Sequence, residues 1–444
     1  MTEPLLSDDD DLYRLPFEEV LSLLQLSTLR YYLHETNPDN GLVRDKTHPK
    51  APVSIAAVGM ALATIPVVVE RGVIIREFAA KLTRKRLRYL LGCPQGPEPD
   101  AAGYKGFFYH FLDIETGRRV WQCELSTIDS AFLFAGAVTV ATYFDRDTAD
   151  EAEIRSLADT LYRRADWNWA CDGGPTLTHG WRPESGFIPH RWQGYDEGLL
   201  LYILGLGSPT HPLPPESYRA YCATHQWKTI YDRELLYSGP LFTHQLSHMW
   251  IDFRGLRDDF MRARGSDYFE NSRQATFVQQ EYAIRNPLNF AGYGPHCWGF
   301  TACDGPGSCK RMVGGVEREF FDYIARGAPF GPDDGTVAPW VAVASLPFAP
   351  EIVLPTLANF KENWGEMISH YGVTCSFNPT FPSKEKKHVG WISGGYYGID
   401  QGPVILMIEN YRSGLLWRLM RQCPYIVRGL SRAGFRGGWL GTRK

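Results

Sequence analysis

Two kinds of helical segment alternate along this chain of 444 residues. Some segments are apolar nearly all round, and these are 53–69, 130–142, 197–206 and 403–408. Others, 16–35 and 150–166, carry their charged side chains on one face. A helix that is apolar on every side must be buried on every side, whereas an amphipathic helix can cover it from outside. The alternation therefore predicts an all-α fold, an α/α barrel with an inner and an outer ring of helices.

Short β-like segments interrupt the helices at 106–113 and 388–400, and we expect them to form hairpins at the rim. The stretches rich in Pro and Gly, 96–103 and 327–335, have the length of loops rather than of domain linkers. We therefore expect an acidic flexible N-terminus over 1–14 and a single barrel domain over 15–444.

The charge of the chain excludes some partners. The 46 basic and 50 acidic residues give a net charge of −4, which favours neither a nucleic acid nor a membrane surface as partner. The longest apolar stretch, Ile55 to Val69, is shorter than the roughly 20 residues of a membrane span. We expect a monomer or a weak homo-oligomer with no membrane partner.

The cysteines and the N-terminus bear on the compartment. Nine cysteines at irregular spacings give no disulfide framework and favour a reducing environment. The N-terminus is acidic where a signal peptide would be basic and then apolar. These features predict a cytoplasmic protein, or a periplasmic one if a leader has been removed.

One dense run, residues 166–213, combines tryptophans with carboxylates, Arg and His among glycines and prolines. Sugars offer flat C–H faces that stack on aromatic rings and hydroxyls that need polar partners. Aromatic residues make up 14% of the chain, more than its core needs. Both features favour a carbohydrate site.

The sequence gives no metal or nucleotide site. His244 and His248 are spaced as in a zinc-binding HExxH helix, but Gln245 replaces the required Glu. The spacing of Cys297, Cys303 and Cys309 does not match a zinc knuckle. We therefore expect no metal and no cofactor.

Carboxylates at two predicted helix starts are the candidate catalytic groups. Ser126 and Asp129 form a capping-box pattern, so Asp129 has a structural explanation, whereas Glu124 precedes the cap and is not needed for it. Asp196 and Glu197 open an apolar helix, where the helix dipole favours negative charge. Trp192 and Tyr195 stand beside this pair, and a carboxyl walled by aromatic rings loses solvation and can stay protonated as a general acid.

A family resemblance covers roughly residues 20–430. The strings FFYHFLD, ELSTIDSAFLFAG, GWRPESGF, RWQGYDEGLLLYILGLGSPTHP, LFTHQLSHMWIDFRGLRD and YYGIDQGPVILMIENYRSGL occur together. This set resembles the bacterial glucoamylase-like family, which includes the endo-β-1,2-glucanases of glycoside hydrolase family 144. It also resembles the transglycosylase region of cyclic β-1,2-glucan synthases. The resemblance implies an (α/α)6 barrel with a β-1,2-glucan cleft, and essential acidic positions at Glu124 and Glu197.

We therefore expect a glycoside hydrolase that cleaves β-1,2-linked glucan between two carboxyls. Glu197 is the predicted general acid, and Glu124 either activates water or acts as nucleophile, although the two roles could be exchanged. The reserve carboxylates are Asp113, Asp129 and Asp196. The candidates for sugar stacking are Trp181, Trp192, Tyr195, Tyr293, Trp298, Trp391 and Tyr397. The candidates for bonding to hydroxyls are His179, Arg182, His244, Gln245, His248, Arg254, Asp400 and Gln401.

Two alternatives to hydrolysis remain open. A transglycosylase acting on β-1,2-glucan or another glucan would have its carboxyls about 5 Å apart, whereas an inverting hydrolase would separate them by roughly 6.5–9.5 Å. A non-catalytic glucan-binding protein would keep the aromatic residues but would not need paired carboxyls.

Overall fold

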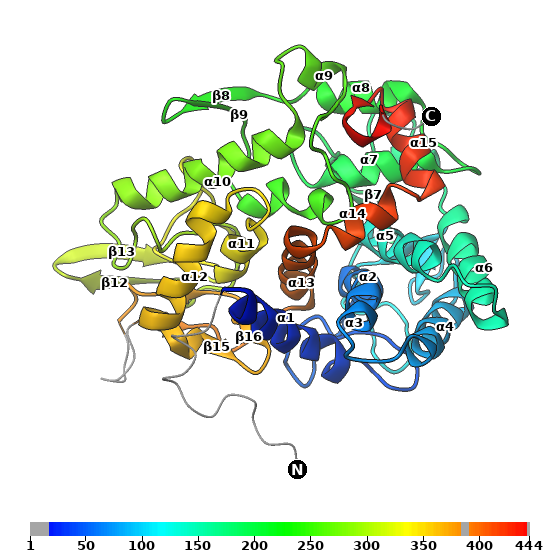
Figure 1. Ribbon diagram of the computed structural model, residues 1–444, viewed down its shortest axis with the longest axis horizontal. Coiled ribbons are helices and arrows are strands. Elements are labelled where there is room, and N and C mark those ends of the chain that lie inside the picture. Colours follow the sequence, from blue (N-terminus) through cyan, green and yellow to red (C-terminus); the bar gives the residue numbers. More distant parts are fainter. Residues whose placement is uncertain (1–16, 383–389, 442–444) are drawn as a thin grey trace.

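The computed structural model describes residues 17–382 and 390–441, so the predicted flexible segment 1–14 lies outside the described residues. The described helices are arranged as two concentric rings (Figure 1). None of them is both long and apolar enough to cross a membrane. That 15–444 form a single domain stays a prediction.

The inner ring is closed over the described residues. Its members are α2 (Ile55–Ala63), α5 (Thr127–Tyr143), α7 (Gly198–Gly207), the 3-10 pair η3 (Leu241–His244) and η4 (Leu246–Met249), α11 (Pro339–Ala344) and α13 (Gly398–Arg412). Helix α2 packs on α5, α5 on α7, α7 on η4, α11 on α13, and α13 on α2. The 3-10 pair is joined to α11 by Gln245, whose Nε2 donates to Val341 O at 2.7 Å and to Ser345 Oγ at 2.8 Å.

Amphipathic helices cover this ring from outside (Figure 1). They are α1 (Phe17–His34), α4 (Arg76–Gly92), α6 (Ala149–Arg163), α8 (Pro215–Cys222), α10 (Tyr268–Arg285) and α12 (Pro350–Trp364), followed by α14 (Leu415–Met420) and α15 (Pro424–Arg432). The chain alternates between an outer and an inner member from α1 to α13. Every residue of α7 is buried, as an inner helix requires. The predicted α/α barrel is confirmed.

The apolar segment 53–69 differs from the single helix expected. Helix α2 ends at its C-cap Thr64, and a second helix, α3 (Ile65–Glu70), follows directly. Pro66 lies in the first turn of α3, where its missing N–H is tolerated, but its ring prevents α2 from continuing through this position. The fourth inner member, formed by two short 3-10 turns, was not among the predicted apolar helices.

Short strands line the rim. The largest sheet is antiparallel in the order β2 (Gly103–Tyr104), β3 (Phe107–Tyr109), β5 (Leu125–Ser126), β6 (Gly180–Arg182) and β7 (Gly186–Phe187). Strand β1 (Val53–Ser54) pairs with β4 (Phe111–Leu112). These strands lead into α2 and α5, so they fix the loops at one end of the inner ring.

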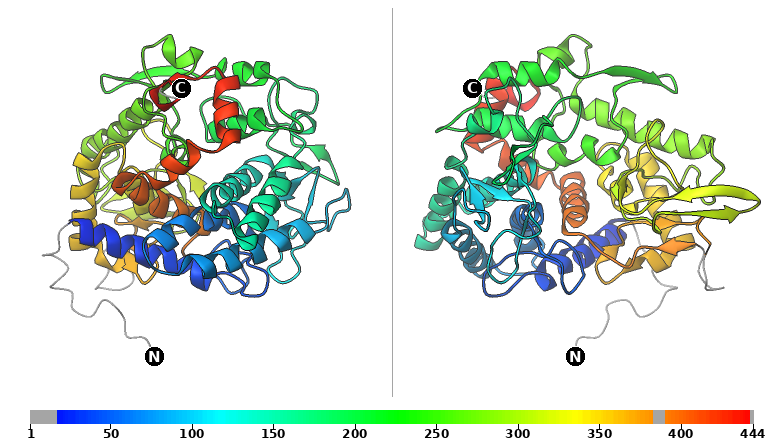
Figure 2. Two further views of the ribbon diagram at one scale, coloured as in Figure 1. Left: turned by 45° about the vertical axis from the view of Figure 1, so that its right-hand side comes forward. Right: turned by 180° about the vertical axis from the view of Figure 1, so that it is seen from behind.

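Other strand pairs decorate the outside. They are β8 (Trp227–Ile230) with β9 (Arg233–Leu236), β10 (Leu256–Arg257) with β19 (Arg436–Gly437), β11 (Ala302–Cys303) with β14 (Ile324–Ala325), and β15 (Ile368–Ser369) with β16 (Gly372–Val373). The hairpin of β12 (Cys309–Val313) and β13 (Val316–Phe320) projects from the body (Figure 2).

The segment 388–400 was predicted to form a hairpin at the rim, and its residues 388–389 lie outside the described residues. Strand β18 (Trp391–Ile392) pairs antiparallel with the preceding strand β17 (Phe377–Asn378), which lies outside 388–400, so the described part of this segment forms no hairpin by itself.

The closest helix contact in the inner ring depends on two glycines. A Cβ on Gly59 of α2 would lie 2.3 Å from Phe132 O, and a Cβ on Gly136 of α5 would lie 2.1 Å from Gly59 O. We expect Gly59→Ala to lower the free energy of unfolding by about 1–3 kcal/mol, because the two helices must separate. Thermal unfolding measures this. Gly92→Ala at the end of α4, where a Cβ meets nothing within 4 Å, is the control and should leave the melting temperature unchanged or raised. Equal melting temperatures for both variants would contradict the predicted contact.

Candidate active site

The N-terminal ends of the inner helices meet at one end of the barrel. Ser54 caps α2, Ser126 caps α5, Glu197 is the N-cap of α7 and Tyr397 that of α13. The backbone N–H of Gly398 donates to Asp45 O at 2.7 Å, and the charges of Asp45 and Asp129 interact, so these ends lie close together. Helix N-termini carry partial positive charge and favour carboxylates beside them.

Glu124 lies directly before β5 and is held by two cationic groups. Its Oε1 is 2.9 Å from His110 Nδ1, and its Oε2 is 3.4 Å from Arg182 on β6. Its side chain is 25% exposed, so it can still reach a ligand. Burial acts to raise the pKa of Glu124, but the hydrogen bond and charge of His110, with the charge of Arg182, hold that pKa below its ordinary value. Glu124 is therefore a carboxylate at neutral pH.

His110 joins Glu124 to a second carboxylate. Its Nε2 lies 3.7 Å from Asp129 Oδ2, and its ring stacks on Phe111 at 3.9 Å between centroids. Burial alone would lower the pKa of His110, but the charges of Asp129 and Glu124 raise it to about 9. Ser126 donates to Asp129 and accepts from its backbone N–H, so the predicted capping pattern is confirmed. An imidazolium thus separates the two carboxylates.

Glu197 has the opposite electrostatic environment. Burial raises the pKa of Glu197, and the negative charges of Asp196 and Asp129 raise it further. Asp196 Oδ1 accepts from Gly198 N and from Tyr221 Oη, both at 2.9 Å, whereas no hydrogen bond to the Glu197 carboxyl comes from another side chain among the described residues. Burial raises the pKa of Asp196 as well, but its two hydrogen-bond donors act against this. Of the pair, Glu197, which is half-buried at the start of α7, is therefore the better candidate for the protonated carboxyl.

The two glutamates occupy the same end of the barrel without touching one another. Glu197 responds to the charge of Asp129, Asp129 lies beside His110, and His110 is bonded to Glu124. The structure thus places Glu197, whose pKa is raised, and Glu124, whose pKa is lowered, at one end of the barrel.

Aromatic and basic side chains from the dense run 166–213 border this end. Trp192 is buried, and its Nε1 donates to Thr127 Oγ1 at 2.9 Å, which ties the loop before α7 to the start of α5. His179 stacks on Trp192 at 4.1 Å. Trp181 pairs with Leu125 across the sheet and is half-buried beside Tyr104. Of these, Trp181, His179 and Arg182 keep accessible surface for a ligand.

A second polar cluster lies at the start of α13. Tyr397 Oη donates to Asp304 Oδ1 at 2.7 Å, and Lys46 Nζ donates to Tyr397 Oη at 3.2 Å. Burial raises the pKa of Asp45 to about 6, although His110 and Lys46 act against this. Asp400 is buried, and its Oδ2 has no hydrogen-bond partner among the described residues. Both amide atoms of Gln401 are also buried without a partner there.

Several predicted sugar contacts are instead parts of the core. Trp298 is fully buried and donates to Thr356 Oγ1 at 2.9 Å, so it offers no face to a ligand. Tyr195 is buried between His244 and Tyr268. The side chains of His244, Gln245 and His248 are buried and bonded to the neighbouring α10 and α11. They close the inner ring and do not contact solvent, so their assignment to hydroxyl binding is corrected.

Three other candidates are occupied elsewhere. Asp113 Oδ1 accepts from the backbone N–H groups of Glu115 and Thr116, so it stabilises a tight turn. Arg254 pairs with Asp252 at 2.7 Å and lies over Trp417 of α14, beyond the C-terminal end of α13. Tyr293 donates to Asp333 at 2.6 Å. Trp391 on β18 stays half-buried and available.

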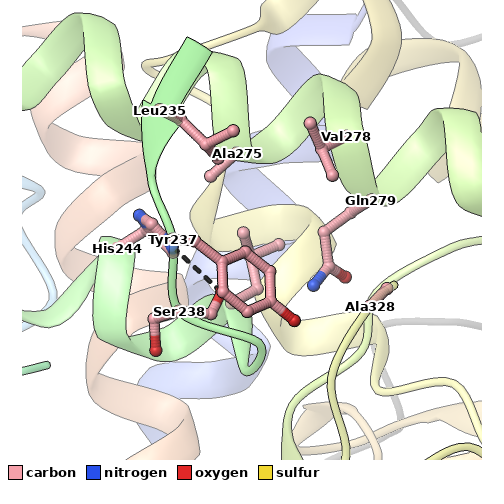
Figure 3. A pocket seen from close by; sticks show the side chains of 9 residues that line it. Leu235, Tyr237, Ser238, His244, Ala275, Val278, Gln279 and Ala328 are labelled. Carbon is pink, nitrogen blue, oxygen red and sulfur yellow. Dashed lines mark hydrogen bonds between the residues drawn. The ribbon is translucent and has the colours of Figure 1, made fainter. Parts of the chain in front are cut away.

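A small cavity near His244 has no chemistry of its own. It lies between β9 and α10, and Figure 3 shows its lining, with His244 directed toward the carbonyl of Ser238 at 3.3 Å. Gln279 there already donates to Gly239 O and Phe300 O. Burial lowers the pKa of His244 to about 4, so this imidazole is neutral. We therefore assign no ligand to this cavity, which is a gap in the packing between β9 and α10.

Sequence reasoning missed His110, Asp45, Lys46 and Asp304. A polar residue inside the aromatic strand string FFYHFLD was a usable signal for His110. The others are brought to the site by contacts between residues far apart in the sequence, such as Tyr397 with Asp304. Over residues 17–382 and 390–441, no group of three or more His, Cys, Asp or Glu side chains is placed to hold a metal ion.

A family model matches this chain. The family model Glycoamylase, described as "Putative glucoamylase", matches residues 189–424. A Bacteroides uniformis protein of the same description has a crystal structure that is 31% identical in sequence. It covers 96% of this chain and 99% of its own, with a TM-score of 0.85.

Two relatives carry names that state an activity. An exo-β-1,2-glucooligosaccharide sophorohydrolase (non-reducing end) from Parabacteroides distasonis is 28% identical over 95% of this chain, which spans 58% of that relative's length. An endo-β-1,2-glucanase from Chitinophaga pinensis, solved with sophorotriose and glucose, is 26% identical. It covers 96% of this chain and 100% of its own, with a TM-score of 0.84.

Proposed function

The chain belongs to the Glycoamylase family, and we propose that it is a glycoside hydrolase that cleaves β-1,2-linked glucan. The observation that carries this proposal is that two carboxyls at one end of the barrel have opposite surroundings. Glu124 is bonded to His110 and Arg182, whereas Glu197 lies near the negative charges of Asp196 and Asp129. Glycoside hydrolysis needs one carboxyl that is protonated and one that is ionised. The β-1,2 linkage is supported by the names of the Parabacteroides and Chitinophaga relatives.

In the proposed reaction, the carboxylic acid of Glu197 donates its proton to the glycosidic oxygen as the bond to the leaving sugar breaks. The Glu124 carboxylate either accepts a proton from the attacking water or attacks the anomeric carbon itself. His110 does not react. It holds Glu124 ionised and separates it from Asp129.

A substrate panel tests the proposed function. The protein is incubated with linear β-1,2-glucan, cyclic β-1,2-glucan, laminarin, cellulose oligomers and starch, and the products are separated by chromatography. We expect short oligosaccharides from β-1,2-glucan alone. Products longer than the substrate would indicate transglycosylation, and binding without products would indicate a non-catalytic protein. Either result would contradict hydrolysis.

The pH dependence of activity should show the effect of the His110 charge on the pKa of Glu124. In the wild-type protein, activity should fall in acid as Glu124 becomes protonated below its depressed pKa. His110→Gln keeps a hydrogen-bond donor but removes the charge, so the pKa of Glu124 should rise and the acidic limb of the kcat/KM profile should move to higher pH. Asp129 and Asp45 face the same imidazole, and Arg182 remains as the second cation beside Glu124.

The control for this variant is His370→Gln, at an exposed histidine in the β15–β16 turn. It should leave the profile unchanged. An unshifted acidic limb in His110→Gln, with the melting temperature retained, would show that His110 does not set the charge of Glu124.

A further inference from the structure

A tryptophan three residues before Glu124 lies mostly outside the core. Trp121 is 69% exposed, in the loop between β4 and β5. Large aromatic side chains are usually withdrawn from water, because their burial is among the most favourable contributions to folding. Here the chain holds the side chain outward.

The backbone at Trp121 is strained. Trp121 and Gln122 both have positive φ, 56° and 50°, and Cys123 N donates to Val120 O at 3.1 Å across them. Positive φ at both central positions is the pattern of a type I′ turn, which strongly favours Asn and Gly. Two residues that rarely adopt this conformation therefore occupy it side by side. Such strain persists only where the surroundings enforce it, and it concentrates at functional sites.

The surroundings of this turn are rigid. Arg119 is buried and donates to Cys123 O at 2.6 Å, and its guanidinium pairs with Glu184 from the β6–β7 turn at 2.6 Å. Val120 N donates to Phe111 O at 3.2 Å, so the loop is bonded back to β4. The backbone of this turn is thus held before any ligand arrives, and it places the indole beside the Phe111 ring.

A continuous row of rings connects Trp121 to the proposed catalytic carboxylate. The Trp121 ring lies 5.4 Å from Phe111, which stacks on His110 at 3.9 Å, and His110 is bonded to Glu124. The indole is the exposed end of this row, which begins at Glu124. Sugars stack their C–H faces on exposed aromatic rings, and a fixed ring loses little entropy when it binds.

We propose that Trp121 is a stacking platform for a glucosyl unit of the substrate, at the end of the row of rings that begins at Glu124. This inference rests on the proposed function. The platform binds a unit beyond the one that reacts, so it sets affinity for longer chains and leaves the chemical step unchanged.

Trp121→Asn separates binding from folding. Asn adopts positive φ readily, so this variant should relieve the strain and keep or raise the melting temperature, while it removes the ring. We expect the affinity for linear β-1,2-glucan, measured by retardation in affinity gel electrophoresis, to fall roughly 3- to 10-fold. KM for long chains should rise in proportion with kcat unchanged. Trp121→Phe keeps a smaller ring and the strain, and should bind with intermediate affinity.

Ile75→Ala is the matched control, because Ile75 is also 69% exposed but precedes the outer helix α4. It should leave retardation unchanged. Equal retardation of the wild type and of Trp121→Asn would overturn the inference. It would also be overturned if the affinity of the variants followed their melting temperatures instead of the presence of an aromatic ring at position 121. Electrophoresis needs no turnover. A wild-type protein that is retarded but releases no product would therefore refute the proposed hydrolysis and still test Trp121.

Discussion

Replacing Glu197 by Gln should lower kcat on β-1,2-glucan by roughly two to four orders of magnitude, the usual contribution of general acid catalysis. The amide keeps the shape and the hydrogen-bonding capacity of the carboxyl but cannot donate its proton to the leaving oxygen. Substrate affinity should survive, because the lost interaction exists only in the transition state. Initial rates at saturating substrate, with binding measured separately, distinguish the two quantities.

The pH profile gives a second test of the same residue. A general acid is active while protonated, and burial beside Asp196 and Asp129 raises the pKa of Glu197. Activity of the wild-type protein should therefore persist through neutral pH and be lost as the pH rises through that raised pKa. Glu197→Gln should lose this alkaline limb along with its rate.

Glu216→Gln is the control, since Glu216 is an exposed carboxyl in the first turn of α8. It should retain full activity. Near-normal turnover in Glu197→Gln at an unchanged melting temperature would remove Glu197 from the mechanism and move the acid role to Asp196 or Asp129.

The fold could be predicted from the sequence because burial follows from composition along each helix. Segments without a polar face, such as 130–142 and 197–206, had only the interior open to them, and they became α5 and α7. The break at Thr64 and the 3-10 turns at 241–249 escaped this reasoning. At these two places, Pro66 and the local backbone conformation determine where a helix ends and which type of helix forms, and hydrophobicity does not.

The site was predictable only in part, because its electrostatics depend on contacts that the sequence does not display. The positions of Glu124 and Glu197 before inner helices follow from capping patterns and from resemblance. The imidazolium that distinguishes them comes from His110, whose place opposite Glu124 depends on strand pairing. Trp298, His244 and His248 show the converse, since a string rich in polar and aromatic residues also suits a buried, hydrogen-bonded core.

Replacing Glu124 by Gln should lower kcat by a similar factor, roughly 10²- to 10⁴-fold, because the amide can neither accept a proton from water nor attack the sugar. The pKa of Glu124 is lowered, so its carboxylate becomes protonated only in acid. The wild-type rate should therefore decline as the pH falls through that pKa. His110 loses an anionic partner in this variant, so its pKa should fall, which histidine NMR titration can follow independently of activity.

The double variant Glu124→Gln with Glu197→Gln decides whether the two residues belong to one reaction. Groups that act in the same transition state are not additive, so the double variant should be little slower than the slower single variant. If the fold-losses of kcat in the two single variants multiply in the double variant, the two residues act independently. Asp129 would then replace Glu124 as the second carboxyl, because it is the acidic residue from α5 whose charge acts on Glu197. Loss of melting temperature in step with activity in all three variants would instead indicate a folding defect, and neither glutamate could then be assigned to the chemistry.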